Sequence, residues 1–322
     1  MSEKNKTKEA RIVFMGTSKF ASEILGAMIA ADLNIISVFT KADKKSGRDR
    51  EIKESEVKIT AKIKNIQVFQ PERLDEESIV EIKNQKPDLI VVAAYGKIIP
   101  ADIINIPEFG TLNIHPSLLP KFRGPSPIQN ALLCGETETG TTIMLIDEGI
   151  DTGDIVKQVK TEIKPEETYS ELSDKLSKLS ASLLIETLPL WIEKKIKPAR
   201  QDDSKATLCQ LIEKSDGKIL WTDEAESIFN RYRALSPWPG IFSFWGNEDA
   251  NKRIKLNKIS FTKNNPAEKH HLGEVFQFEK GVGVQTTLGV VILEEVQIEG
   301  KENVKIENFV NGYQDFIGSI LK

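Results

Sequence analysis

Residues 89–94 read Leu-Ile-Val-Val-Ala-Ala, six apolar residues in a row. A run of this length favours a β-strand that is buried on both faces, as in a parallel sheet covered by helices. Around it the sequence predicts further strands at 12–15, 35–39, 68–70 and 112–115, alternating with helical stretches at 20–31, 79–84 and 128–133. Residues 142–146 and 154–159 resemble an additional pair of strands. The alternation predicts a doubly wound α/β domain with a Rossmann-like parallel sheet.

The second half of the chain has a different character. A helical pattern runs over 169–196, interrupted by Pro189, and the polar stretch 194–207 is interpreted as a linker. A helical stretch at 224–235 is followed by short β-rich segments at 241–245, 253–261, 273–278, 283–287 and 290–298. Such closely spaced strands predict a smaller OB-like β-barrel. We therefore expect two domains, 1–207 and 208–322, with residues 1–10 as a frayed tail.

Composition excludes several classes of protein. The 322 residues contain no run of eighteen apolar residues, and the polar N-terminus has no apolar core of a secretory signal. Two cysteines, Cys134 and Cys209, form no disulfide framework and fit a reducing cytoplasm, where we expect this protein to act. Three histidines and the absence of CxxC or HExxH spacings predict no metal site. The net charge of −4 argues only mildly against nucleic-acid binding, because phosphate contacts are local.

Gly16, which follows the first predicted strand, begins no nucleotide-binding motif. The stretch Gly16-Thr17-Ser18-Lys19-Phe20-Ala21 carries a single glycine instead of GxGxxG, and GxxxxGK[ST] is absent from the chain. A nicotinamide-dependent dehydrogenase or a P-loop enzyme is therefore not expected.

The densest chemical signal is Leu112-Asn113-Ile114-His115, at the end of a predicted strand. Side chains alternate along a strand, so Asn113 and His115 point to one face. An amide that donates to an oxyanion, beside an imidazole that moves protons, suits acyl transfer. The spacing leaves four carboxylates open as a third partner, namely Asp147, Glu148, Asp151 and Asp154. A histidine bonded to the backbone, a capping asparagine and a solvated acidic turn are the alternatives without a function.

Three short motifs suggest a family. Asn113-x-His115-x-Ser117-Leu118-Leu119-Pro120, Arg123-Gly124 and Asp151-Thr152-Gly153-Asp154 resemble the active-site signature of the 10-formyltetrahydrofolate-dependent formyltransferases. Similarity also extends past the linker. The run Arg233-Ala234-Leu235-Ser236-Pro237-Trp238-Pro239-Gly240 is similar to the members that formylate methionine carried on initiator tRNA.

The resemblance implies a role for each matching residue. Asn113, His115 and Asp151 fall on the catalytic positions, and the cosubstrate is 10-formyltetrahydrofolate, with no metal. The residues implied to bind folate are Ser117, Leu118, Leu119 and Pro120, together with Tyr95, Gly96 and Ile98. Initiator methionyl-tRNA is the implied partner, and the implied state is a monomer with no membrane contact.

Two basic regions are expected to contact tRNA. The first lies in the loop 41–58 and comprises Lys41, Lys44, Lys45, Arg48 and Arg50; the second, on a barrel strand, comprises Lys252, Arg253 and Lys255. The loop departs from the family, because Glu54 and Glu56 stand where prolines are common. A formyltransferase for another amine, such as a nucleotide-linked amino sugar, a hydrolase of formylfolate and a non-enzymatic binding module remain alternative functions.

Overall fold

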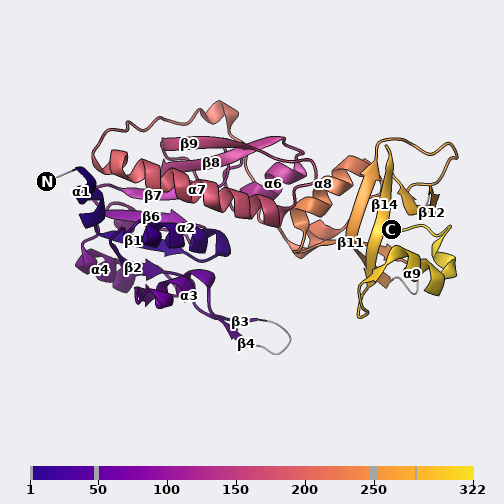
Figure 1. Cartoon of the computed structure of the whole chain (residues 1–322), viewed down its shortest axis with the longest axis horizontal. Helices are drawn as coiled ribbons and strands as arrows, with labels where there is room; N and C mark the ends of the chain where they lie inside the picture. Colours follow the sequence, from indigo (N-terminus) through magenta and orange to yellow (C-terminus); the bar gives the residue numbers. More distant parts are fainter. Residues whose placement is uncertain (1–2, 47–50, 247–251, 280) are drawn as a thin grey trace. The chain divides into compact units, whose positions relative to one another are not determined.

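The computed structural model describes residues 3–46, 51–246, 252–279 and 281–322 (Figure 1). The chain forms two compact units. Unit 1 comprises residues 1–127, 138–163 and 172–210, and unit 2 comprises 128–137, 164–171 and 211–322. The division is thus not a single cut, because the short segments 128–137 and 164–171 are grouped with unit 2.

Unit 1 is built on a seven-stranded sheet. Its order is β5 (Gln67–Phe69), β2 (Ile35–Phe39), β1 (Ile12–Gly16), β6 (Leu89–Ala93), β7 (Thr111–His115), β8 (Glu138–Leu145) and β9 (Ile155–Glu162). The first five strands run parallel, and β8 and β9 are antiparallel to their neighbours. The predicted doubly wound fold is confirmed. The strand order reverses at β1, and ligands of such sheets bind at the carboxyl ends of the strands near this point.

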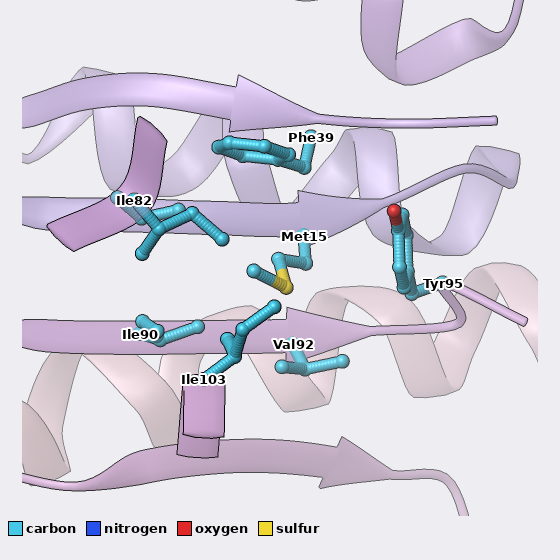
Figure 2. Close-up of a cluster of buried hydrophobic side chains, with 8 residues drawn as sticks. Met15, Phe39, Ile82, Ile90, Val92, Tyr95 and Ile103 are labelled. Carbon is cyan, nitrogen blue, oxygen red and sulfur yellow. The ribbon is translucent and has the colours of Figure 1, made fainter. Parts of the chain in front are cut away.

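Helices cover both faces of this sheet. In unit 1 they are α2 (Lys19–Ala30), α3 (Glu56–Ile63), α4 (Glu76–Gln85), α5 (Ala101–Ile104) and most of α7 (Tyr169–Ile192), whereas α6 (Pro127–Leu133) falls almost wholly in unit 2. Alternation along β1 sends Val13 and Met15 into a cluster with Ile82 of α4 and Ile103 of α5 (Figure 2). On α7, Ser180 Oγ lies 2.8 Å from Thr141 Oγ1 of β8. Burial on both faces explains why β6 is apolar throughout.

The segment 1–10, expected to be a frayed tail, is described by the structure from residue 3 onward. Residues Glu3–Glu9 form helix α1. Lys8 Nζ lies 2.7 Å from Asp32 Oδ2, and Thr7 and Ala10 are buried. These contacts hold the segment in place.

Unit 2 contains an antiparallel sheet ordered β10 (Ile241–Trp245), β11 (Lys252–Thr262), β14 (Val290–Ile298), β13 (Gly281–Gln285) and β12 (Val275–Phe278), with β15 (Val304–Lys305) beside β14. Helices α8 (Ala225–Leu235) and α9 (Ile306–Gly312) belong to the same unit.

The chain end joins the two outer strands of this sheet. Lys322 exchanges two main-chain hydrogen bonds of 2.9 Å with Phe244 of β10. On the other side, Val275 of β12 exchanges bonds with Gly318 and Ser319, and Leu321 N donates to Gly273 O. The segment Gly318–Lys322 therefore bridges the two outer strands and closes the sheet into a small barrel, which is consistent with an OB-like fold.

In the part of the chain that the structure describes, no helix is long and apolar enough to cross a membrane.

Candidate active site

Strand β7 carries Asn113 and His115 to one face of the sheet. Asn113 lies beside Val92 of β6 and Met144 of β8, and His115 pairs with Thr142. The intervening Ile114 is 1% exposed and points to the opposite face. His115 is buried, and Asn113 is partly exposed. The pair therefore ends a central strand at the edge where ligands reach such a sheet.

Asp151 completes this pair. Its Oδ1 accepts a hydrogen bond from Asn113 Nδ2 at 3.2 Å, and its Oδ2 lies 3.5 Å from His115 Nδ1. The same Oδ2 accepts from the main-chain N–H of Gly124 at 2.9 Å. Asp147 instead accepts bonds from Gly149 N and Thr152 Oγ1. Of the carboxylates left open by the spacing, the structure brings Asp151 to the asparagine and the histidine.

The backbone at Asp151 is unusual. Its φ of 53° lies in the left-handed region, which costs a non-glycine residue about 1 kcal/mol or more. Gly153 beside it has no room for a side chain, because a Cβ there would collide with Leu145 O. This tight turn is what directs the carboxylate toward β7.

The ring of His115 is held by a main-chain group that the sequence does not reveal. Nε2 lies 2.8 Å from the carbonyl oxygen of Phe122. A carbonyl only accepts, so Nε2 carries the hydrogen and donates it. In the neutral ring Nδ1 then holds the lone pair, on the side that faces Asp151. The Asp151 carboxylate, 3.5 Å away, has no hydrogen to donate to this lone pair, so Nδ1 stays available as a proton acceptor.

The segment 117–120, expected to bind folate, is fixed by hydrogen bonds. Ser117 is fully buried, and its Oγ donates to Lys121 O at 2.7 Å. Thr142 Oγ1 donates to Ser117 O and accepts from Leu119 N. Leu119 is buried, and Leu118 and Pro120 are partly exposed. The loop therefore offers a ligand mainly its main chain and the sides of these two residues.

The other expected folate residues occupy three different environments. Tyr95 is 2% exposed in the core cluster, where burial raises its pKa to about 12 (Figure 2). Gly96 has a φ of 71°, and the ammonium group of Lys41 packs against the place of a Cβ there. Ile98 is 93% exposed, an apolar side chain free to meet a flat ring.

The basic loop is only partly described. Arg48 and Arg50 lie outside the described residues, and so do the side chains of Lys44 and Lys45; the short strands β3 (Lys44–Ser46) and β4 (Glu51–Lys53) pair as a hairpin. At its base Lys58 Nζ lies 2.5 Å from Asp43 Oδ2 and 3.1 Å from Glu54 Oε1. Hydrogen bonding to Lys58 lowers the pKa of the Asp43 carboxyl. Lys58 thus anchors the hairpin, while Lys41 lies beside Gly96.

In unit 2 the expected basic residues divide between two faces. Arg253 and Lys255 alternate with the buried Ile254 and lie opposite Phe244 and Phe242 of β10. The guanidinium carbon of Arg253 is 3.7 Å from the centroid of the Phe242 ring. Lys252 lies instead over Trp245, at 5.8 Å from the ring centroid. Arg253 and Lys255 together with the two phenylalanines form what we call the aromatic–basic face.

Sequence reasoning missed the main-chain carbonyl of Phe122 and the side chain of Gln201. Main-chain groups leave no side-chain signature, and Gln201 stands in the polar stretch interpreted as a linker. Its amide nitrogen donates to Asp151 O at 2.9 Å. Within the described residues, no three His, Cys, Asp or Glu side chains are grouped as ligands for a metal ion.

Comparisons with protein families agree with this architecture. Residues 10–188 match the family model described as formyl transferase, and residues 211–314 match the model described as its C-terminal domain. The methionyl-tRNA formyltransferase of Caldicellulosiruptor saccharolyticus is 43% identical over 314 residues, covering 96% of this chain and 99% of that protein. The methionyl-tRNA formyltransferase of Dictyoglomus thermophilum is 41% identical over 312 residues, with coverages of 96% and 98%.

Solved structures are similar in fold. An N-formyltransferase from Helicobacter canadensis, in complex with folinic acid and dTDP-3-aminofucose, aligns with a TM-score of 0.64 at 18% identity over 88% of this chain and 98% of that one. HypX from Aquifex aeolicus, in complex with tetrahydrofolic acid, aligns with a TM-score of 0.61 at 18% identity over 96% of this chain and 48% of that one. At these identities the likeness shows the fold alone.

Proposed function

We propose that this chain, which belongs to the formyl transferase family, moves a formyl group from 10-formyltetrahydrofolate to the α-amino group of methionine on initiator tRNA. The observation that carries the chemistry is the convergence of Asn113, His115 and Asp151 at the end of β7. The choice of methionyl-tRNA as acceptor rests on the two relatives that are 41% and 43% identical over 96% of this chain.

Asn113 would stabilise the transition state. When the lone pair of the amine attacks the formyl carbon, a C–N bond forms and the carbonyl electrons move onto oxygen. Asn113 Nδ2 has two hydrogens, and the bond to Asp151 uses one of them. The other can donate to the new oxyanion, a contact whose removal typically costs about 10²–10³ in rate.

His115 and Asp151 would move the proton. Nδ1 of neutral His115 takes a proton from the attacking nitrogen, and the resulting imidazolium donates to the Asp151 carboxylate and to Phe122 O. Collapse of the intermediate breaks the bond from the formyl carbon to N10. The proton then passes to N10, which leaves as an amine. General acid–base catalysis of this kind contributes roughly 10²–10⁴-fold.

The side chains and main-chain groups near the site suit 10-formyltetrahydrofolate as the cosubstrate. The exposed Ile98 and the partly exposed Leu118 and Pro120 are apolar surfaces for a pteridine, and Gly96 lets a ligand approach the main chain closely. Folate binding by Ser117, Leu119 and Tyr95 would use their main-chain atoms, because these side chains are buried.

Initiator tRNA would meet the two basic regions. On the aromatic–basic face Arg253 and Lys255 would contact phosphates. Lys252, Lys41, Lys44, Lys45, Arg48 and Arg50 complete the proposed set. A chain with this substrate acts where translation starts, in the cytoplasm, and the family resemblance implies a monomer.

Transfer of label tests the function directly. The protein is incubated with 10-formyltetrahydrofolate labelled in the formyl group and with methionine-charged initiator tRNA, a nucleotide-linked amino sugar, or water alone as acceptor. Label should enter the methionine of the tRNA. Label that enters the amino sugar, or that appears only as formate, contradicts the proposal.

A further inference from the structure

Gln201 is bonded at every position of its side-chain amide. Oε1 accepts from Arg123 Nε at 3.0 Å and Nη2 at 2.8 Å. Nε2 donates to the main-chain oxygens of Asp151 at 2.9 Å and of Gly153 at 2.7 Å. The residue is only 5% exposed. Four hydrogen bonds thus join two loops that are far apart in sequence, one of which contains the carboxylate of the candidate active site.

The orientation of this amide is fixed by its partners. Guanidinium groups only donate and main-chain carbonyls only accept. A flipped amide would place its NH₂ group against the guanidinium of Arg123 and its oxygen against the carbonyl oxygens of Asp151 and Gly153. Arg123 is itself buried and held by a further contact, at 2.8 Å, with Asp203 Oδ1. The amide therefore acts as a rigid connection between Arg123 and the Asp151 turn.

The residues after Gln201 hold the same loop through its main chain. Thr207 Oγ1 accepts from Phe122 N at 2.8 Å, and Thr207 O accepts from Arg123 N at 2.9 Å. Cys209 N donates to Arg123 O at 2.8 Å. These bonds lie on either side of two main-chain groups of the active site. Phe122 O orients His115, and Gly124 N binds Asp151.

We propose that Gln201 is a positioning residue that holds the Asp151 carboxylate in register with Asn113 and His115. The inference rests on the proposed function, since it assumes that Asp151 takes part in formyl transfer. The turn at Asp151 has a positive φ and relaxes readily unless neighbouring groups hold it. Gln201 supplies two bonds to the carbonyls of this turn.

Gln201→Glu isolates this role. The substitution keeps the size of the side chain and an oxygen toward Arg123, but it places a second oxygen against the carbonyls of Asp151 and Gly153. The turn should move by a fraction of an ångström up to an ångström, and misplacement on this scale lowers rates by about 10–100-fold. The kcat should fall by this factor while the KM for 10-formyltetrahydrofolate stays within about threefold, because the folate loop is held by other bonds.

A double-mutant cycle separates positioning from general damage. Rates are measured for the wild type, Gln201→Glu, Asp151→Ala and the double variant. If Gln201 acts through Asp151, its substitution should change the rate less than about twofold once the carboxylate is absent. The matched control is Gln85→Glu in the same unit, at a glutamine that accepts from Ser37 and donates to Glu81. It should leave kcat unchanged.

The outcomes are distinct. Wild-type kcat for Gln201→Glu, an equal fall in the Asp151→Ala background, or an equal fall for Gln85→Glu overturns the positioning role. If Asp151→Ala itself retains the wild-type rate, the proposed function of the trio fails instead.

Discussion

Asp151→Asn should disable two residues of the active site at once. The two oxygens of Asp151 accept from Asn113 Nδ2 and from Gly124 N. An amide at this position has one oxygen and one NH₂ group, and the NH₂ group must face a donor. Gly124 N belongs to the main chain and cannot turn, so the NH₂ group must face Asn113. Asn113 would then turn its side-chain oxygen toward the NH₂ group of the new asparagine. The NH₂ group of Asn113 would point away from the oxyanion.

The size of the effect follows from these two losses. Removal of an oxyanion donor costs about 10²–10³ in rate. Loss of the carboxylate beside a catalytic imidazole costs up to about 10⁴ in a catalytic triad. We therefore expect Asp151→Asn to lower the single-turnover rate by at least about 10³, which is about 4 kcal/mol of transition-state stabilisation. Asn113→Ala should cost about 10²–10³, and adding it to Asp151→Asn should change little, because Asn113 no longer donates.

Single-turnover transfer of labelled formyl to charged tRNA measures these rates, with unfolding followed by circular dichroism. Asp147→Asn is the matched control. It is the same substitution in the same loop, at a carboxylate that accepts from Gly149 and Thr152. A rate for Asp151→Asn within about tenfold of wild type, or an equal loss for Asp147→Asn, refutes the reasoning.

Two further predictions concern unit 2. Lys255→Ala should weaken tRNA binding and lower the slope of log Kd against log salt by about one. Lys258→Ala should lower this slope less, because Lys258 is paired with Glu294 at 2.8 Å. Filter binding across salt concentrations measures both slopes, and equal slopes for the two variants would contradict the role of the aromatic–basic face. Deletion of Gly318–Lys322 removes the buried Leu321 and five main-chain hydrogen bonds, which join this segment to strands β10 and β12 and to Gly273. The loss of roughly 4–8 kcal/mol in the free energy of unfolding is comparable to the whole stability of a small domain. Calorimetry should show unit 2 unfolded and the transition of unit 1 retained; an unchanged transition for unit 2 would show that the barrel does not depend on closure.

Sequence patterns predicted the features that local chemistry controls. The apolar run at 89–94 identified a buried parallel strand, and the period of two along β7 placed Asn113 and His115 on one face. Spacing could not choose among the carboxylates, because the choice depends on a positive φ at Asp151 and on the N–H of Gly124, neither of which has a side-chain pattern. Family resemblance, rather than spacing, selected Asp151.

The polar stretch 194–207 shows why the rest could not be predicted. Its charged and polar composition is typical of a linker, yet Gln201 and Thr207 make hydrogen bonds to residues about 50 to 85 positions earlier in the chain. Lys58 is a similar case. By composition it is one of the basic residues of the loop that could bind tRNA, but its ammonium group is paired with Asp43 and Glu54. In both cases the role of a polar or charged side chain depends on the partner that the fold places beside it, which composition does not reveal.

Closure of the barrel by Gly318–Lys322 also has a kinetic consequence. The outer strands β10 and β12 are completed by a segment that is translated about 75 and 40 residues after them, so their edges stay open until this segment has been synthesised. Contacts of such long range form slowly, because the entropy of closing the loop must be lost before the bonds are gained. On the ribosome, the sheet of unit 1 can form first, and the nascent unit 2 is the part exposed to aggregation until Gly318–Lys322 emerges.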